Sequence, residues 1–407
     1  MSSYIRALRM VNFRNYADAT VLLAPGLNVL VGGNAQGKTN LLEAIAFAIT
    51  GSTPRTANDQ EVVGWGADFA RAEMRVSLDE DEERKVAVGY APGQKKRLTV
   101  DGAPASSLNA YAAGGAGVRV VTFFPDDIRV IKGAPSDRRE FLDALLSALR
   151  PSYARAVAEY AKAVQQRNQL LRRIRDGFSS ARTLSTWDRK VVDLGTQVLE
   201  ARTVAVGPLG SLFEDAVTAL YGPEKATLRY SYSAPLDGYS EALREARRAD
   251  VDRGTTSVGP HRDDFAVLFG GISMTTYGSQ GQQRLATLAL KFAAREYLRE
   301  ETGQDPLLLF DDVMSELDER RRGYLSEYFL GSTQAVISTT NLEYFADEVL
   351  ERARVVRISG GAIHATTSDG VGSGTVERTP LKYATNRRNS SWENVQGVLY
   401  STGAILC

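Results

Sequence analysis

The chain has 407 residues, and its 49 lysines and arginines are balanced by 49 aspartates and glutamates. This length suffices for about two or three domains with cores of their own. Zero net charge excludes a protein that is positive over its whole surface, so nucleic-acid binding would need a local patch or a second factor. The single cysteine, Cys407, and the two histidines argue against zinc ribbons, disulfide frameworks and cysteine nucleophiles.

The sequence has no segment typical of a membrane span or a signal peptide. Charged residues occur throughout the N-terminal segment, and no run of about 18 apolar residues is present. We therefore expect a cytoplasmic protein that has no membrane partner.

The N-terminal segment predicts a strand, a glycine loop and a helix. Apolar and polar residues alternate from Ile5 to Phe13, and a second apolar run, 27–31, leads directly into GGNAQGKT. The dense apolar segment LLEAIAFAI follows and stops at Gly51, which is typical of a buried helix.

GGNAQGKT matches G-x-x-x-x-G-K-[ST], the phosphate-binding P-loop. Its glycines let backbone N–H groups face a β-phosphate, Lys38 reaches the β and γ oxygens, and Thr39 is a ligand for Mg²⁺. A chance match in a chain of this length is about a one-per-cent event, given average glycine usage. The predicted ATP-binding residues are Gly32, Gly33, Asn34, Ala35, Gln36, Gly37, Lys38, Thr39 and Asn40.

The middle of the chain changes from strand to helix patterns. Short alternating stretches over 70–101 predict antiparallel hairpins, and 118–127 reads as a buried strand ending in a loop. Helical spacing follows from 136 to about 249, which predicts about three or four helices. The expected interruptions of these helices are near Pro151, Gly177 and Pro208.

Strand and helix patterns alternate again over 254–358, as in a sheet covered by helices. We therefore predict an α/β fold in which 1–135 and 255–360 form a split head with an antiparallel β subdomain, and 136–254 forms a compact helical lid. The segment 361–407 is rich in Gly, Ser, Thr and Asn without periodicity, and is predicted to be a poorly ordered extension.

A second motif, LLLFDD at 307–312, is an apolar run closed by two carboxylates. In P-loop enzymes such a strand lies beside the P-loop strand, so Asp311 is expected to hold Mg²⁺. Asp312 would face the γ-phosphate and act with Lys38 in catalysis by orienting or deprotonating water. Asp126, after another strand tip, either contacts Mg²⁺ or water or has no such role. Without a P-loop in the same chain, LLLFDD would more often be a capped core strand. The presence of the P-loop favours the catalytic interpretation.

The sequence YGSQGQQR at 277–284 opens an apolar helix. It resembles the signature of ABC-type ATPases, in which a Ser and a Gly at a helix N-terminus contact ATP held by the opposite subunit. Ser279, Gly281 and Gln282 are the candidates for this contact, and the alternative is an ordinary helix cap. DDVMSELD resembles the D-loop of the same class. About 240 residues separate Lys38 from Ser279, too few for a long coiled coil.

Several longer segments resemble the RecF family of bacterial recombination mediators, within the SMC/ABC-type ATPases. The resemblance is collinear over about residues 3–360, and the segments that carry it are IRALRMVNFRNY, GGNAQGKTNLLEAI, FFPDDIRVIKGAPSDRREFLD, VGPHRDDF, YGSQGQQRLATLALKFA and LLLFDDVMSELDERRR.

This resemblance implies binding of ATP and Mg²⁺, and of double-stranded, gapped or junction DNA. It also implies an ATP-dependent homodimer with slow, DNA-stimulated ATP hydrolysis. Together with RecO and RecR, such a protein places RecA, its indirect partner, at single-stranded gaps during repair, replication restart and the SOS response, in association with the nucleoid.

Three features depart from the pattern. Most ABC enzymes have Glu where this chain has Asp312, and the shorter arm holds the base farther back, which fits slow turnover. In ISTTN, either Thr339 or Thr340 stands in place of the switch histidine. The segment from about 361 has no counterpart in the family.

Basic residues of the lid are candidates for DNA contacts. The spacing of Arg167, Arg172 and Arg175 lets them share much of one helix face, next to Arg173. Acidic residues are interspersed, so a solvated helix face is the alternative, and it is the family resemblance that favours phosphate contact. His261 has no second His or Cys nearby and is predicted to be a hydrogen-bonded structural residue.

Two other functions also use a P-loop: an ABC-type transport ATPase subunit and a small-molecule kinase. Compact transporter heads lack a large helical insertion. In a small-molecule kinase the signature segment YGSQGQQR would have no function. ATP-dependent dimerisation would argue against the kinase, and DNA-stimulated hydrolysis against the transporter.

Overall fold

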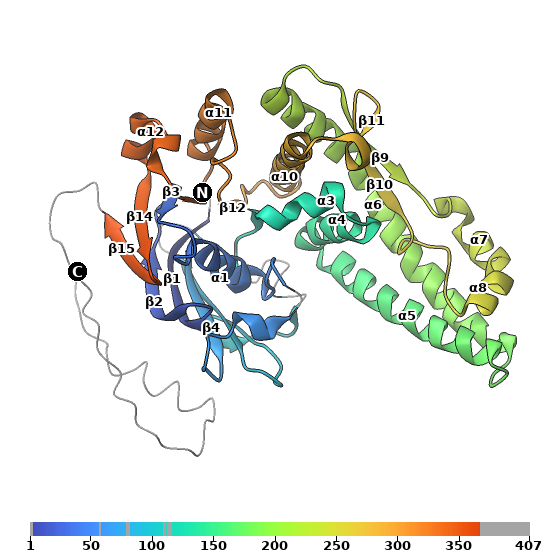
Figure 1. The fold of residues 1–407 in the computed structure, drawn as a ribbon. Helices are drawn as coiled ribbons and strands as arrows, with labels where there is room; N and C mark the ends of the chain where they lie inside the picture. The colour runs from blue at the N-terminus through green and yellow to red at the C-terminus, as the bar shows by residue number, and fades with distance from the viewer. Residues whose placement is uncertain (1–2, 57, 79–81, 109–110, 112–115, 367–407) are drawn as a thin grey trace, which may run out of the picture. The chain divides into compact units, whose positions relative to one another are not determined.

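The computed structural model describes residues 3–366, apart from 57, 79–81, 109–110 and 112–115. These residues belong to one unit, 1–368 (Figure 1). Most of the predicted poorly ordered extension, 367–407, lies outside the described residues.

An antiparallel sheet runs in the order β2-β1-β4-β5-β6-β7 and confirms the strand and hairpins predicted near the N-terminus. The buried Ile5 and Leu8 lie three residues apart in β1, because the register shifts between Ile5 and Ala7. The strands are β1 (Tyr4–Phe13), β2 (Tyr16–Leu22), β4 (Ala70–Ser77), β5 (Glu83–Tyr90), β6 (Arg97–Val100) and β7 (Ala103–Pro104).

A second, mainly parallel sheet runs in the order β15-β14-β3-β13-β12-β8. The strand of LLLFDD, β12, was expected beside the P-loop strand β3; this was wrong, because β13 pairs with both and lies between them. The strands are β3 (Gly26–Val31), β8 (Val120–Phe123), β12 (Leu307–Phe310), β13 (Gln334–Thr339), β14 (Arg354–Ser359) and β15 (Ala362–Thr366).

Strand β15 corrects the expected start of the unstructured tail. It pairs antiparallel with β14, from Ser359 opposite Ala362 to Val355 opposite Thr366. Gly360 and Gly361 turn the chain at positive φ, which glycine adopts without a Cβ penalty. Gly361, the first glycine of the predicted extension, therefore lies in a hairpin turn.

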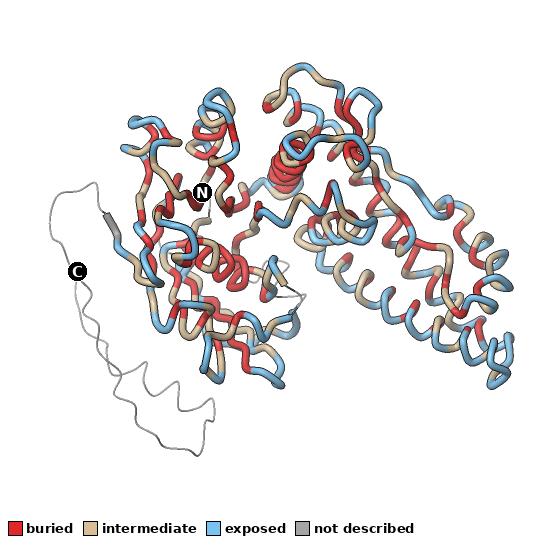
Figure 2. Tube along the Cα trace, in the orientation of Figure 1, coloured by how far each residue is buried: buried red, intermediate tan, exposed pale blue. Residues whose placement is uncertain are grey.

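Helix α1 (Lys38–Thr50) lies between the two sheets and contacts strands of both. This position explains why its sequence is apolar on every side rather than along one stripe, and Figure 2 shows it as a mainly buried helix. Gly51, at φ +72°, closes the helix by donating its N–H to the carbonyl of Phe47, as the sequence predicted.

Three long helices follow: α4 (Pro135–Leu149), α5 (Pro151–Arg175) and α6 (Leu184–Tyr221). The breaks predicted near Pro151 and Gly177 are confirmed, but the break near Pro208 is wrong, because α6 continues through it. Pro208 and Val204 are both exposed, so water can reach the carbonyl that the proline leaves without a helical donor. Buried Leu209 and Phe213 hold the next turns in the core.

The inserted region also contains a strand, which corrects the expectation of helices alone. Strand β9 (Ala226–Ser231) pairs with β10 (Asp264–Phe269), and β10 pairs with β11 (Ile272–Ser273). This small sheet crosses the predicted lid boundary at 254. The division into head and lid stays a prediction. The sheet joins β10 and β11, on the predicted head side of this boundary, to β9 on the lid side.

Helix α10 (Gln280–Thr302) is buried over most of its length and contacts both α6 and β8 (Figure 2). None of the helices within the described part of 3–366 is long and apolar enough to cross a membrane. The remaining α-helices are α3 (Arg129–Lys132), α7 (Tyr239–Glu245), α8 (Arg247–Arg253), α9 (Met274–Tyr277), α11 (Glu319–Leu330) and α12 (Asp347–Arg352). The 3-10 helices are η1 (Asp59–Val62), η3 (Pro125–Ile128), η4 (Ala181–Thr183), η5 (Leu236–Gly238) and η6 (Leu342–Tyr344).

Candidate nucleotide-binding site

The P-loop connects the end of β3 to the start of α1, and two of its positions, Gly32 and Gly37, have no room for a side chain. A Cβ on Gly32 would lie 2.2 Å from the carbonyl oxygen of Ile358. Gly37 has φ +115°, and a Cβ there would lie 2.7 Å from Nδ2 of Asn15. Ala35, at φ +60°, also adopts the left-handed conformation. The loop is therefore held in a conformation that most other residues would disrupt.

Lys38 is a buried cation, 7% exposed, held by backbone dipoles. Its Nζ donates to the carbonyl oxygens of Gly32, at 2.6 Å, and Gly33, at 2.7 Å. Burial lowers the pKa of Lys38, against the charges of Asp312 and Asp311, which raise it. Because neutral carbonyls compensate a charge only partly, a phosphate would be a better partner for Lys38.

Asp311 brings three elements together at the end of β12. Its Oδ2 accepts a hydrogen bond from Oγ1 of Thr39 at 2.8 Å, and its Oδ1 accepts one from Oγ of Ser338 at 2.5 Å. The Thr39 hydroxyl and the Asp311 carboxylate are adjacent oxygen donors of the kind that Mg²⁺ prefers, so these residues fit the predicted ion. Ser338 stands at the tip of the intervening strand β13.

Asp312 has an unusual backbone and one unpaired oxygen. Its φ is +46°, in the left-handed region, and its N–H donates to Oγ of Ser338 at 3.0 Å. Oδ2 accepts from Oγ of Ser315 at 2.9 Å, whereas Oδ1 is buried without a hydrogen-bond partner among the described residues. A buried carboxylate oxygen without a hydrogen-bond partner is suited to accepting a proton or a hydrogen bond from water.

Asp126 lies just beyond the end of β8, the strand that pairs with β12. The N–H of Asp311 donates to the carbonyl of Phe123 at 2.8 Å, which fixes the two strand ends at one level. Asp126 itself is exposed, whereas Asp127 accepts from the N–H of Phe124 and pairs with Lys291 at 2.9 Å. A Mg²⁺ contact by Asp126 stays a prediction.

The polar residues of the P-loop are tied to neighbouring turns. Oε1 of Gln36 accepts from the N–H of Gly360 at 2.5 Å, and the backbone carbonyl of Gln36 accepts from Nδ2 of Asn15 at 3.3 Å. Asn40 donates to Oδ1 of Asn15 at 2.8 Å, and the Asn34 carbonyl accepts from Nε2 of Gln36 at 3.4 Å. In this structure Gln36 and Asn40 thus support the loop.

Sequence reasoning missed three residues that border this site: Asn15, Tyr16 and Ser338. Tyr16 is buried and donates its hydroxyl to the carbonyl of Gly37 at 3.0 Å, and burial raises its pKa. Asn15 and Tyr16 end the segment IRALRMVNFRNY, which carries part of the family resemblance, but no local pattern ties them to the P-loop.

Which threonine stands in place of the switch histidine stays a prediction. Thr339 is buried, and its Oγ1 donates to the carbonyl of Asn341 at 2.9 Å. Thr340 is partly exposed. The side chain from this segment that contacts Asp311 and the Asp312 backbone is that of Ser338.

The signature residues form the exposed start of α10. Ser279 caps the helix by accepting the N–H of Gln282 at 3.2 Å, and Oε1 of Gln282 accepts the N–H of Ser279 at 2.9 Å. Nε2 of Gln282 donates to Oη of Tyr221 at 3.1 Å, so this side chain is already engaged. Ser279 and Gly281 are exposed, and in the described residues no hydrogen bond joins them to the P-loop.

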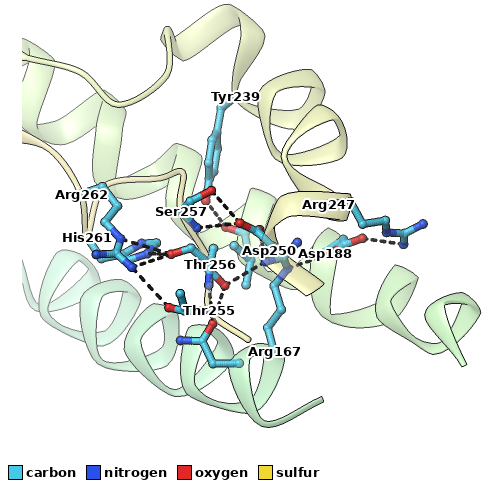
Figure 3. A network of polar contacts seen from close by, with 12 residues as sticks. Arg167, Asp188, Tyr239, Arg247, Asp250, Thr255, Thr256, Ser257, His261 and Arg262 are labelled. Carbon is cyan, nitrogen blue, oxygen red and sulfur yellow. Dashed lines mark hydrogen bonds and ion pairs between the residues drawn. The ribbon is translucent and has the colours of Figure 1, made fainter. Parts of the chain in front are cut away.

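Arg167 is not on the DNA-facing surface predicted for it (Figure 3). It is fully buried, with Nε donating to Asp188 at 2.8 Å and Nη1 to Asp250 at 2.7 Å and to Thr256 at 2.9 Å. The predicted shared face was wrong because Asp188 and Asp250 come from α6 and α8, which pack against α5.

The other three arginines of this group, Arg172, Arg173 and Arg175, are exposed. Nε of Arg172 donates to the carbonyl of Gly254 at 3.4 Å, and Nε of Arg175 to Asp176 at 3.0 Å. Their contact with DNA stays a prediction.

His261 is a structural residue, as predicted. Its Nε2 lies 3.1 Å from the carbonyl of Thr256, and its Nδ1 lies 2.7 Å from Oη of Tyr160. Because a carbonyl only accepts, the ring carries its proton on Nε2 and accepts from Tyr160 at Nδ1. Burial lowers the pKa of His261 to about 4, which favours this neutral form.

Known proteins resemble this chain over most of its length. The family model described as AAA domain matches residues 7–123. The DNA replication and repair protein RecF of Heliobacterium modesticaldum is 35% identical over 369 residues, covering 88% of this chain and 98% of that protein. The protein of the same name from Bacillus subtilis is 34% identical over 372 residues, covering 88% of this chain and 99% of that protein.

Two solved structures are also similar to this chain over most of its length. The recombination mediator protein RecF-ATP in the RecFOR pathway matches with a TM-score of 0.82 and 31% identity, covering 90% of this chain and 98% of that one. An Smc head domain derived from Pyrococcus furiosus, with a TM-score of 0.53 and 15% identity over 89% of this chain and 96% of that one, shares the fold alone. Together these likenesses show that the chain belongs to the RecF family, the P-loop ATPases of DNA replication, repair and recombination.

Proposed function

We propose that this protein is a recombination mediator that dimerises on ATP, binds double-stranded, gapped or junction DNA, and hydrolyses ATP slowly with stimulation by DNA. With RecO and RecR it helps to load RecA at single-stranded gaps. The observation that carries the proposal is the exposed signature end of α10, at Ser279 and Gly281, on a helix that is otherwise mostly buried.

The P-loop side of the site supplies the nucleotide contacts. Lys38 exchanges the carbonyls of Gly32 and Gly33 for β- and γ-phosphate oxygens, which carry the opposite charge. Thr39 and Asp311 would hold Mg²⁺, and the ion would supply positive charge next to the phosphates.

Asp312 acts on the attacking water. Its free Oδ1 accepts the hydrogen bond or proton of that water, while Ser315 holds the other oxygen. The short aspartate side chain keeps this oxygen farther from the γ-phosphate than a glutamate would, which fits slow hydrolysis.

The signature side of the site fits the nucleotide of a second copy. The first backbone N–H groups of α10 and its dipole favour a γ-phosphate, and Ser279 and Gly281 are open to solvent. Two copies that exchange these surfaces around ATP would also place two sets of Arg172, Arg173 and Arg175 on one particle. Because the chain has no net charge, this doubling would strengthen phosphate binding through counterion release.

Sedimentation velocity with the variant Ser279→Arg tests this function. We expect wild type to dimerise with ATP and to bind a gapped DNA duplex more tightly as a dimer. Ser279→Arg should bind ATP as a monomer but not dimerise, because the larger side chain occupies the interface. The matched control is Ser240→Arg, at an exposed serine on α7, which should behave as wild type.

Two results would contradict the proposal. A Ser279→Arg variant that dimerises with ATP as wild type does would remove the signature from the interface. Loss of ATP binding by the monomeric variant, with the control unaffected, would place Ser279 in the pocket of its own subunit.

A further inference from the structure

The backbone of Asp312 is held in the left-handed conformation by contacts from several elements. Its φ is +46°, a conformation that is unfavourable for a non-glycine residue and persists only where its surroundings enforce it. Ser338 accepts the Asp312 N–H, and the single hydroxyl proton of Ser315 is shared between the Asp312 Oδ2, at 2.9 Å, and the Asp312 carbonyl, at 3.0 Å. Ser315 belongs to the same turn, and Ser338 to β13.

A further contact to Asp312 comes from the signature helix. Nη2 of Arg284 donates to the carbonyl oxygen of Asp312 at 3.2 Å. Nη1 of the same guanidinium pairs with Oε1 of Glu316 at 2.5 Å, and its central carbon lies 5.8 Å from the ring centroid of Phe123. The Arg284 side chain is 19% exposed, so its contact with the Asp312 carbonyl is partly shielded from water, whereas the Glu316 side chain is 60% exposed.

The arginine fork matches this arrangement better than a lysine could. It donates to a carbonyl and a carboxylate at once, from a planar group that also lies over an aromatic ring. The two acceptors flank the turn 312–316, so Arg284 fixes both ends of that turn. A single ammonium group could satisfy one of them fully, but not both in the same geometry.

We propose that Arg284 is a positioning residue for ATP hydrolysis. By holding the Asp312 carbonyl, it sets the left-handed backbone and therefore the direction of the free Oδ1 oxygen. Because Arg284 lies in the helix that Ser279 begins, displacement of α10 by a second subunit's nucleotide would be transmitted to Asp312. This inference rests on the proposed function, in which Asp312 acts on the attacking water.

Steady-state ATP hydrolysis in the presence of DNA tests this role in the full chain. We expect Arg284→Gln to lower kcat about tenfold or more while KM and ATP affinity stay within about twofold, since small misplacement of a catalytic group mainly affects the chemical step. Arg284→Lys should recover part of the loss. The matched control is Arg299→Gln, which removes an arginine from a surface ion pair on the same helix and should leave kcat unchanged.

Asp312→Asn separates failure of this inference from failure of the proposed function. If Asp312→Asn is inactive and Arg284→Gln has wild-type kcat, only the positioning role is overturned. If Asp312→Asn hydrolyses ATP normally, the role proposed for Asp312 fails first. The residual rate of Asp312→Asn should be unchanged by adding Arg284→Gln, because Arg284 acts through Asp312.

A purely structural role for Arg284 gives a different result. In that case Arg284→Gln would lower the unfolding temperature and the ATP affinity together with kcat, and Arg284→Lys would not restore kcat selectively. Adding Arg284→Gln to Asp312→Asn would then also lower the residual hydrolysis rate of Asp312→Asn further. Any of these outcomes would overturn the positioning role.

Discussion

The P-loop and the inserted helices each contain a buried cation, but the two cations are stabilised in different ways. Lys38 donates to two neutral backbone carbonyls, and burial lowers its pKa. Arg167 donates to two carboxylates, Asp188 and Asp250, and to the hydroxyl of Thr256. The charge of Arg167 is therefore compensated within the fold, whereas that of Lys38 is compensated only in part.

This difference distinguishes a binding group from a structural group. A ligand anion can replace the carbonyls around Lys38 at a gain, because phosphate carries charge and carbonyls do not. Replacing the partners of Arg167 would leave the fully buried Asp250 without its cation, although Asp188 keeps its ion pair with Arg247, so a phosphate cannot compete for this arginine. Burial of a cation therefore does not by itself indicate a ligand site; the nature of its partners does.

The largest effect should follow from Arg167→Met. Removal of one partner leaves Asp250, which is fully buried, without its cation, and breaking a buried pair in this way costs about 3–5 kcal/mol of unfolding free energy. Urea unfolding of the variant and of wild type measures this loss. The matched control Arg173→Met, at an exposed position of the same helix, should change stability by less than about 0.5 kcal/mol.

A loss below about 1 kcal/mol for Arg167→Met would contradict this comparison. It would mean that the pair behaves as a surface ion pair, and that solvent reaches Asp250 easily in the folded protein.

Lys38→Met should have the opposite pattern, with a large effect on ligand binding and a small effect on stability. Loss of a charged contact to the β- and γ-phosphates should weaken ATP binding by about a hundredfold, or about 3 kcal/mol. The unfolding free energy should change by less than about 1 kcal/mol, because only neutral carbonyls lose a donor. Titration with a fluorescent ATP analogue and urea unfolding give the two quantities.

Lys38→Gln serves as a second variant, because its amide can donate to one of the carbonyls without carrying charge. ATP affinity near that of wild type in both variants would contradict the assignment of Lys38 to the phosphates. Destabilisation as large as that of Arg167→Met would remove the distinction between the two cations.

The two regions also differ in how far the sequence predicts them. Gly32, Gly37 and Thr39 stand within eight consecutive residues, so a short motif is enough to locate them. The contacts that require the two glycines nevertheless come from distant segments, at Ile358 and Asn15. Asp188 and Asp250 are 21 and 83 residues away from Arg167, and only the packing of α5 against α6 and α8 brings them together. Charge spacing along one helix contains no information about such partners.

The same reason explains the other residues that sequence reasoning missed or misplaced. Ser338 reaches Asp311 because β13 lies between β3 and β12, and that strand order is set by pairing across the whole sheet. Pro208 does not break α6, because its neighbours Leu209 and Phe213 are buried against other elements and Pro208 itself faces solvent. Tertiary packing decided both outcomes against the local pattern.

The smallest effect concerns His261, which belongs to the same network as Arg167 through Thr256 (Figure 3). Its folded pKa, about 4, lies below the ordinary value of 6.5 expected in the unfolded chain. Between these values the unfolded chain binds more protons than the folded protein, so stability is lost as the pH falls from 6.5 towards 4. The contribution is fully present above the unfolded pKa.

Urea unfolding at two pH values measures this effect. From about pH 7.5 to about pH 5.5 the contribution of His261 to the unfolding free energy should fall by about 1 kcal/mol. His261→Gln keeps one donor for Thr256 and one acceptor for Tyr160 but does not titrate, so its stability should depend on pH less steeply by that amount. Equal pH dependence in the two proteins would show that His261 is protonated as readily in the folded state, and that the polar network around Arg167 is open to water.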